Sequence, residues 1–114
     1  MMVNQTLKQE IIQIEADFCA ALSDPTRILI LYALNEHPFN VTELTNELGI
    51  PQSTTSRHLK ILRDRGLVYT ERQGTVITYY LADARIIQAM DLLRSAMRDR
   101  LAQQVSLIEE AHIE

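Results

Sequence analysis

The most constraining feature of the sequence is a tight, glycine-containing turn between two short amphipathic segments. Asn40 and Glu43 have the spacing of a capping box, which marks the start of a helix. That helix ends at Gly49, because glycine adopts the left-handed conformation that terminates helices. A second helical pattern begins at Gln52, after only a short turn. Two helices joined in this way predict a helix-turn-helix over residues 41–64.

The second helix of this pair has an apolar inner stripe and a polar outer face. Thr55, Leu59 and Leu62 recur at spacings of three and four residues, so they share one face of a helix. A buried Thr55 hydroxyl is expected to lower the stability slightly. His58 is interpreted as a buried, hydrogen-bonded imidazole, with a role on the outer surface as the alternative.

After this helix the hydrophobic period changes to that of strands. Two runs rich in β-branched and aromatic residues, 67–72 and 75–81, flank Gln73 and Gly74. This pattern is typical of a β-hairpin. A hairpin over residues 67–81, directly after a helix-turn-helix, is a wing.

Two helices are predicted before the helix-turn-helix. Apolar residues at helical spacing indicate the first over residues 5–22. The segment Ser23-Asp24-Pro25 supplies an N-cap oxygen followed by a first-turn proline for the second, which runs to about Asn35. Residues 37–39 are expected to form a loop.

A long helix is predicted over residues 83–110. Its apolar residues recur about every 3.7 residues, so they stay on one side of a nearly straight helix. A chain of 114 residues cannot cover that whole stripe alone, and a second copy is the natural cover. The alternative is a helix folded back on its own domain. The residues expected in a dimer interface are Ile11, Ile14, Phe18, Ile86, Met90, Leu93, Met97 and Leu101.

Length and composition limit the class of protein. The chain is expected to be a single domain, 1–114, because 114 residues are too few for two ordinary domains. An aromatic content of 5% with three glycines and three prolines favours a mainly α fold with a small β-hairpin. No segment is typical of a membrane span or a signal peptide, so a cytoplasmic protein without a membrane partner is expected.

The charge is unevenly distributed. The net charge is −4, yet residues 52–74 carry five basic and two acidic side chains. One basic face on an acidic body is typical of a protein that touches nucleic-acid phosphate through a single edge. A window of this length also reaches such a balance by chance.

These elements and two sequence strings together resemble the ArsR family of bacterial regulators. The strings are residues 21–27 and residues 52–62, the latter followed by residues 66–68, and the similarity covers about 18–101. The resemblance implies a winged helix-turn-helix homodimer that represses transcription by binding a palindromic operator in double-stranded DNA. Pro51 departs from the Ser or Thr usual at that turn.

The outer face of the second helix of the pair has the chemistry to read DNA. Gln and Arg form paired hydrogen bonds to base edges, Ser and Thr offer short, adaptable hydroxyls, and Lys60 can reach phosphate. The resemblance adds backbone contacts from the wing turn. A merely solvated face is the alternative in both places. The candidate DNA-binding residues are Gln52, Ser53, Thr54, Ser56, Arg57, Lys60, Arg72, Gln73 and Thr75.

The metal-ligand positions of that family lack suitable ligands here. Residues 40–42, where arsenic-type sensors carry cysteines, are Asn, Val and Thr. Asp83 and Asp99 match zinc-sensor positions, but Arg85 and Ala96 replace the other two ligands and cannot coordinate a metal. No metal and no cofactor are therefore predicted, and the effector is left open.

Cys19 is the one cysteine of the chain, so it has no internal disulfide partner. It lies beside the apolar stripe of the first helix. It is interpreted as a core cysteine, with a redox or effector role as the alternative.

Two other functional classes compete with a DNA-binding regulator. A winged-helix protein-interaction module is one, but it has no need of a basic outer helix face. An enzyme is the weaker one, because the sequence has no phosphate loop, nucleophile motif or catalytic carboxylate pair. No catalytic residue is predicted.

Overall fold

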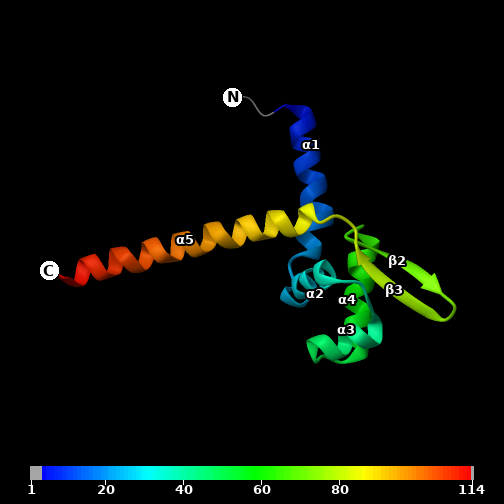
Figure 1. The fold of residues 1–114 in the computed structure, drawn as a ribbon. Helices are drawn as coiled ribbons and strands as arrows, with labels where there is room; N and C mark the ends of the chain where they lie inside the picture. Colours follow the sequence, from blue (N-terminus) through cyan, green and yellow to red (C-terminus); the bar gives the residue numbers. More distant parts are fainter. Residues whose placement is uncertain (1–3, 114) are drawn as a thin grey trace. The chain divides into compact units, whose positions relative to one another are not determined.

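The computed structural model describes residues 4–113, with side chains over residues 4–111. The chain forms two compact units that divide between Asp83 and Ala84 (Figure 1). The first unit contains seven of the labelled helices and strands together with one π-helical turn, and the second is a single helix.

The N-terminal helix forms in two parts. Helix α1, Gln5–Ile14, starts at Asn4, whose side chain accepts a hydrogen bond from the Leu7 amide at 2.7 Å. It continues as the π-helical turn η1, Glu15–Cys19, and helical structure ends at Ala21. The prediction over residues 5–22 is correct apart from this turn. A π-helical turn shifts the 3.6-residue period locally, so apolar spacing alone does not reveal it.

Helix α2, Pro25–Glu36, starts at the predicted cap, where the Asp24 carboxylate accepts a hydrogen bond from the Thr26 amide at 2.8 Å. The expected loop over residues 37–39 is wrong at its end, because Phe39–Asn40 forms strand β1. Phe39 pairs with Tyr79 in antiparallel register. A two-residue strand has no alternating pattern to read, since it depends on a distant partner.

The helix-turn-helix has the predicted bounds. Helix α3, Val41–Leu48, carries a complete capping box between Asn40 and Glu43, and Gly49 ends it with φ of 66°. Helix α4, Gln52–Asp64, follows after Pro51.

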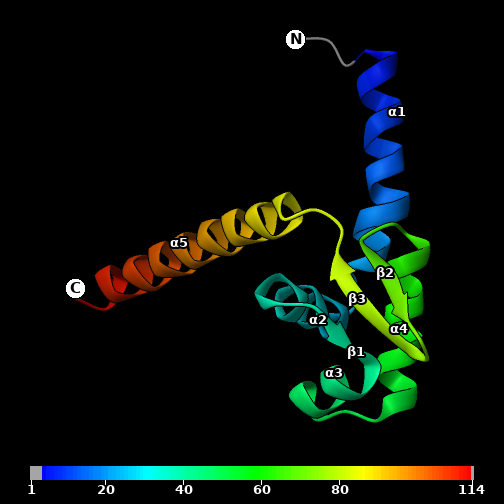
Figure 2. The same cartoon turned by 45° about the vertical axis from the view of Figure 1, so that its right-hand side comes forward.

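Strands β2, Val68–Gln73, and β3, Val76–Leu81, form the wing. Together with β1 they make a three-stranded antiparallel sheet in the order β1-β3-β2. The β2–β3 hairpin projects beyond the helices of its unit as a two-stranded ribbon (Figure 1), and Figure 2 shows the same hairpin turned by 45°. Gly74 at its tip has φ of 62°, a conformation that favours glycine.

The core of the first unit lies between α2, α3, α4 and the base of the wing. Six aliphatic side chains there are fully buried: Ile30, Leu31, Leu44, Leu59, Leu62 and Leu67. Thr55 is also fully buried, but the Thr45 hydroxyl donates to its oxygen at 2.9 Å and it donates to the Pro51 carbonyl at 3.3 Å. The expected stability cost of Thr55 is therefore offset by hydrogen bonds.

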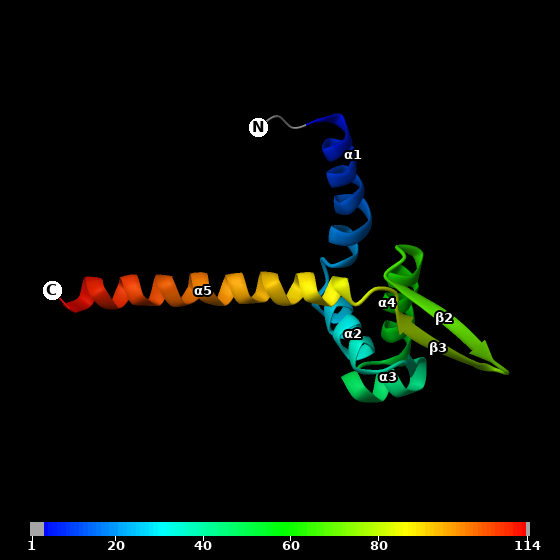
Figure 3. The ribbon, with the colours of Figure 1, turned by 45° about the horizontal axis from the view of Figure 1, so that its top comes forward.

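The second unit is helix α5, Arg85–Ile113, one unbroken helix of 29 residues (Figure 3). It starts two residues after the predicted position and extends three residues beyond its predicted end. In the described part of the chain, no helix is both long enough and apolar enough to cross a membrane.

Candidate nucleic-acid interface

Helix α4 has two chemically different faces on opposite sides. Thr55, Leu59 and Leu62 are buried in the core, as predicted. Burial of this stripe forces the opposite face outward, because side chains on a helix keep a fixed angular spacing. The exposed residues are the predicted Gln52, Ser53, Ser56, Arg57 and Lys60, and Thr54 is half-buried at the edge.

The wing tip brings the other three candidate residues together. Arg72, Gln73 and Thr75 are all exposed around the Gly74 turn. The Arg72 guanidinium donates from Nε to the Gly74 carbonyl at 3.1 Å. Arg72 therefore stabilises its own turn, while its side chain is exposed and its guanidinium has more N–H donors than this bond uses.

A basic groove between α4 and the wing extends this surface. It is a cavity of about 330 Å³ lined by Lys60, Arg63, Asp64 and Tyr79. Lys60 and Asp64 form an exposed ion pair of 3.0 Å. Arg63 is exposed on the same side of the helix, one turn after Lys60.

Arg63 and Tyr79 are absent from the sequence-based set of candidate DNA contacts. For Arg63 a signal was present, since residues three apart on a helix are neighbours and Lys60 was already in the set. For Tyr79 the sequence has no such signal, because its place beside α4 depends on how β3 packs.

His58 is 2% exposed, which confirms the interpretation of a buried imidazole. Its Nδ1 lies 3.2 Å from an Nη atom of Arg27, a buried residue of α2. Burial lowers the pKa of His58; Arg57 and Arg27 lower it further, and the Asp24 carboxylate partly opposes them. Burial of the ring therefore favours the neutral imidazole.

Two tyrosine rings stack at the base of the wing. Tyr69 and Tyr80 face each other across β2 and β3, with ring centroids 5.1 Å apart and planes inclined by 9°. Burial and a hydrogen bond with Glu71 raise the pKa of Tyr80. This stack fixes where the strands leave the core and hence where the wing tip lies.

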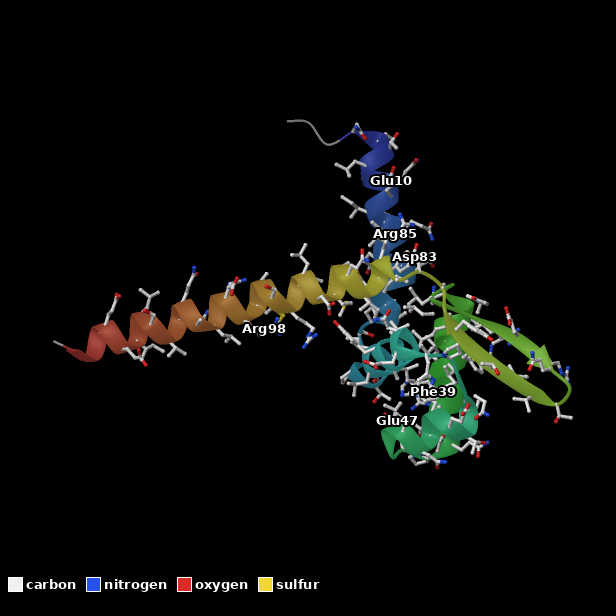
Figure 4. The ribbon with its side chains drawn as sticks, in the orientation of Figure 1. Glu10, Phe39, Glu47, Asp83, Arg85 and Arg98 are labelled. Atoms are coloured by element: carbon white, nitrogen blue, oxygen red, sulfur yellow. The ribbon has the colours of Figure 1, made fainter. Side chains whose placement is uncertain are left out.

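A second cavity, of about 420 Å³, is acidic. It lies between the end of α2, β1 and α3, and Phe39 and Glu47 on its wall are labelled in Figure 4. Glu36 also lines it, and both carboxylates are exposed. Its charge is opposite to that of the α4 surface, so it is unsuited to phosphate.

The candidate effector residue Cys19 lies at the end of the N-terminal helix. Cys19 lies in η1 and is exposed, so its interpretation as a core cysteine of the subunit is wrong. Within residues 4–113, no three His, Cys, Asp or Glu side chains are grouped closely enough to hold a metal ion.

The order of elements, the buried inner stripe of α4 and the exposed hairpin define a winged helix-turn-helix protein. The sequence model described as bacterial regulatory protein, ArsR family, matches residues 24–70. The HTH-type transcriptional repressor SmtB of Mycobacterium tuberculosis is 36% identical over 94 residues, which cover 82% of this chain and 70% of that protein. The chain belongs to the ArsR family of bacterial regulators.

Two further relatives show the range of the similarity. The HTH-type transcriptional regulator NmtR of Mycobacterium tuberculosis is 41% identical over 71 residues, or 62% of this chain, and the match spans 59% of that protein. A solved structure of a homodimeric winged helix-turn-helix DNA-binding domain from Mycobacterium bovis has a TM-score of 0.72. It is 25% identical and the match covers 89% of this chain and 94% of that one.

Proposed function

We propose that this protein is a homodimeric repressor that acts in the cytoplasm and binds a palindromic operator through α4 and the wing of each subunit. The observation that carries the proposal is the two-faced α4. Its inner stripe is fully buried, while its outer face presents amides, hydroxyls and cations without an apolar residue among the candidate contacts. A protein-interaction module has no use for such a face.

The first turns of α4 are suited to reading bases. Gln52 and Arg57 carry side chains that form paired hydrogen bonds with base edges in the major groove. Ser53 and Ser56 supply short hydroxyl groups beside them. The N-terminal turns of a recognition helix are the part that enters the groove, so these four residues would specify the sequence.

Phosphate contacts would come from the groove and the wing tip. Lys60 and Arg63 lie on one side of α4, and Arg72 lies at the wing. These cations would hold the backbone strand that runs between the major groove occupied by α4 and the adjacent minor groove. Such contacts position the protein and carry no sequence information.

Dimer formation would supply the second recognition helix. The apolar residues Ile11, Ile14 and Phe18 of the N-terminal helix are all at least 37% exposed in the subunit. Leu93, Met97 and Leu101 of α5 are about 60% exposed. Ile86 and Met90 of the same stripe are half-buried. The homodimeric state of the M. bovis domain supports covering these residues with a second copy.

Repression would follow when the dimer occupies its operator. Two recognition helices about 34 Å apart bind successive major grooves, and a dimer seated on a promoter excludes RNA polymerase. An inducing signal would act by stabilising a dimer whose helices have a different spacing.

The test is binding of the purified protein to the DNA upstream of its own gene across a salt series. Arg57→Ala is expected to lose about 1–3 kcal/mol of specific binding and to discriminate less at one base position. Lys60→Ala is expected to weaken binding uniformly across sequences and to reduce the salt slope by about one.

Lys8→Ala is the matched control, because it removes one exposed cation from α1. Specific binding that Arg57→Ala weakens and Lys8→Ala retains supports the proposal. Absence of binding to any genomic DNA fragment at low salt contradicts it and favours the interaction module. Repeating the assay with a thiol oxidant, with Cys19→Ser beside the wild type, tests whether the exposed thiol is the sensor.

A further inference from the structure

Arg27 presents a physical problem, because it is a buried cation. It is 8% exposed, and the Asp24 carboxylate interacts with it electrostatically. Within the described part of the chain, its hydrogen bonds all go to neutral groups. A buried charge of this kind is costly unless its surroundings compensate it.

The end of the N-terminal helix supplies most of the compensation. Nε of Arg27 donates to the Ala21 carbonyl at 2.6 Å, and one Nη donates to the Ala20 carbonyl at 3.5 Å. The Ser23 hydroxyl oxygen accepts from the same Nη at 3.4 Å. The last carbonyls of a helix lack internal partners and carry the negative end of its dipole. Arg27 therefore caps this helix end together with Ser23, whose hydroxyl donates to the Ala20 carbonyl at 2.7 Å.

The other end of the guanidinium reaches the recognition helix. Its second Nη lies 3.2 Å from Nδ1 of His58. A guanidinium can only donate, so Nδ1 must be the acceptor and the ring proton must sit on Nε2. His58 lies directly between Arg57 and Leu59 on α4, on the buried side. The contact thus joins the turn over residues 20–23 to the inner face of the DNA-reading helix.

A second, exposed link runs between the same two regions. Arg65, the residue that ends α4, donates to the Ala16 carbonyl at 3.2 Å and approaches Asp17 at 3.5 Å. Its side chain is 44% exposed, so water can replace these bonds. Water cannot easily replace the bonds of Arg27, and this makes Arg27 the firmer of the two connections.

We propose that Arg27 is a positioning residue of the DNA-binding surface, which fixes the orientation of α4 relative to the end of the N-terminal helix through His58. This inference rests on the proposed function of α4. A displacement of the turn over residues 20–23 would move the guanidinium, and the guanidinium would move α4. The N-terminal helix, a proposed part of the dimer interface, would thereby influence DNA affinity.

Protonation of His58 would break this connection. The imidazolium has no free acceptor, and it would place a second cation beside Arg27. The charged groups acting on His58 are Asp24 and Arg27 from α2 and its cap, and Arg57 from α4. Of these only Asp24 favours the proton, so acid conditions are required to charge the ring. DNA affinity should then fall for a reason unrelated to phosphate contacts.

The experiment compares operator affinity and its pH profile, between about pH 5 and pH 8, for three variants and the wild type. Arg27→Lys keeps the charge but loses the forked donors, and it should weaken binding within the range of about 5- to 150-fold typical of coupling between sites. His58→Gln keeps a neutral acceptor that cannot be protonated, so its operator affinity should lose the acid-side fall. His37→Gln is the matched control, because His37 is exposed and bonded only to its neighbour Pro38.

The results are read on folded dimers, verified by circular dichroism and sedimentation. Unchanged affinity and an unchanged pH profile in Arg27→Lys would overturn the inference. So would a pH profile of His58→Gln identical to that of the wild type. A purely structural role would lower the melting temperature of Arg27→Lys and leave the affinity of the folded protein intact.

A measurement without DNA separates this inference from the proposed function. Nuclear magnetic resonance of the wild-type imidazole should show His58 with an unprotonated Nδ1. In Arg27→Lys, the backbone amide signals of α4 should shift along residues 52–60. If the wild type binds no DNA, the proposed function fails. If the amide signals of α4 do not move in Arg27→Lys, the positioning role fails, whether or not the wild type binds DNA.

Discussion

The first unit and helix α5 both contain many aliphatic residues, but they differ in how far these side chains are buried. In the first unit, Leu44, Leu59 and Leu62 are completely buried. In α5, Leu93 is 60% and Leu101 is 58% exposed. The first unit therefore forms its own core, whereas one helix cannot bury its apolar stripe by itself.

This difference separates two tasks. The candidate residues on α4 lie in the first unit, whose core side chains are buried within one chain. The proposed interface on α5 instead exposes apolar area, and covering it with a second copy would contribute about 25 cal/mol for each Å² removed from water. Under that proposal, the dimer would alter the spacing of its two α4 helices without unfolding either subunit.

The largest expected effect is on stability and concerns the core of the first unit. Leu62→Ala should destabilise the protein by about 2–5 kcal/mol, because it leaves a cavity beneath α4. Urea unfolding followed by circular dichroism measures the loss. Leu92→Ala, at a 73% exposed position of α5, is the matched control and should change stability by less than about 0.5 kcal/mol. Equal losses in the two variants would show that the two regions do not differ in this way.

The next effect concerns the stripe of α5. Leu93→Glu combined with Leu101→Glu should separate the dimer, since an apolar interface cannot accommodate unpaired carboxylates. Sedimentation should show monomers that keep their helical content, and operator affinity should fall at least about tenfold because one half-site is lost.

Leu92→Glu supplies the control for that pair, because its spacing places it off the stripe formed by Leu93, Met97 and Leu101. It should remain dimeric. A double variant that stays dimeric at micromolar concentration contradicts the proposed interface.

The elements predicted correctly from the sequence are those with local signals. The capping box of Asn40 and Glu43, the stop at Gly49 and the period change near Gly66 each involve residues close together in the chain. They set the bounds of α3, α4 and the wing to within one or two residues. The outer face of α4 followed from the same periodicity once its inner stripe was identified.

The features that the sequence does not reveal depend on distant partners. Strand β1 exists because Phe39 meets Tyr79, forty residues further along. The contact between Arg27 and His58 joins residues 31 positions apart. The exposure of Cys19 depends on how the helix around it packs, and apolar spacing does not determine that packing. In each case the decisive quantity is a distance in space.

A smaller effect concerns the hydroxyl pair of Thr45 and Thr55. Thr55→Val should destabilise the protein by about 1 kcal/mol, because the Thr45 hydroxyl loses its acceptor and the Pro51 carbonyl loses a donor. Thr45→Val with Thr55→Val should restore part of that loss, since both partners then become apolar. Thermal unfolding of the two single variants and the double variant forms the required cycle. Strictly additive losses would show that the hydroxyl pair contributes nothing.

The smallest effect is a pH dependence of stability confined to the first unit. The pKa of His58 is lowered in the folded state, chiefly by burial. The unfolded chain therefore binds a proton, with its ordinary pKa of about 6.5, before the folded protein does. Stability from this source is complete above that pKa and declines as the pH falls below it. Chemical unfolding at successive pH values should show this decline in the wild type and in His37→Gln, and a smaller decline in His58→Gln. Identical curves for all three would mean that the buried imidazole does not resist protonation, and that the connection from Arg27 to α4 is insensitive to acid.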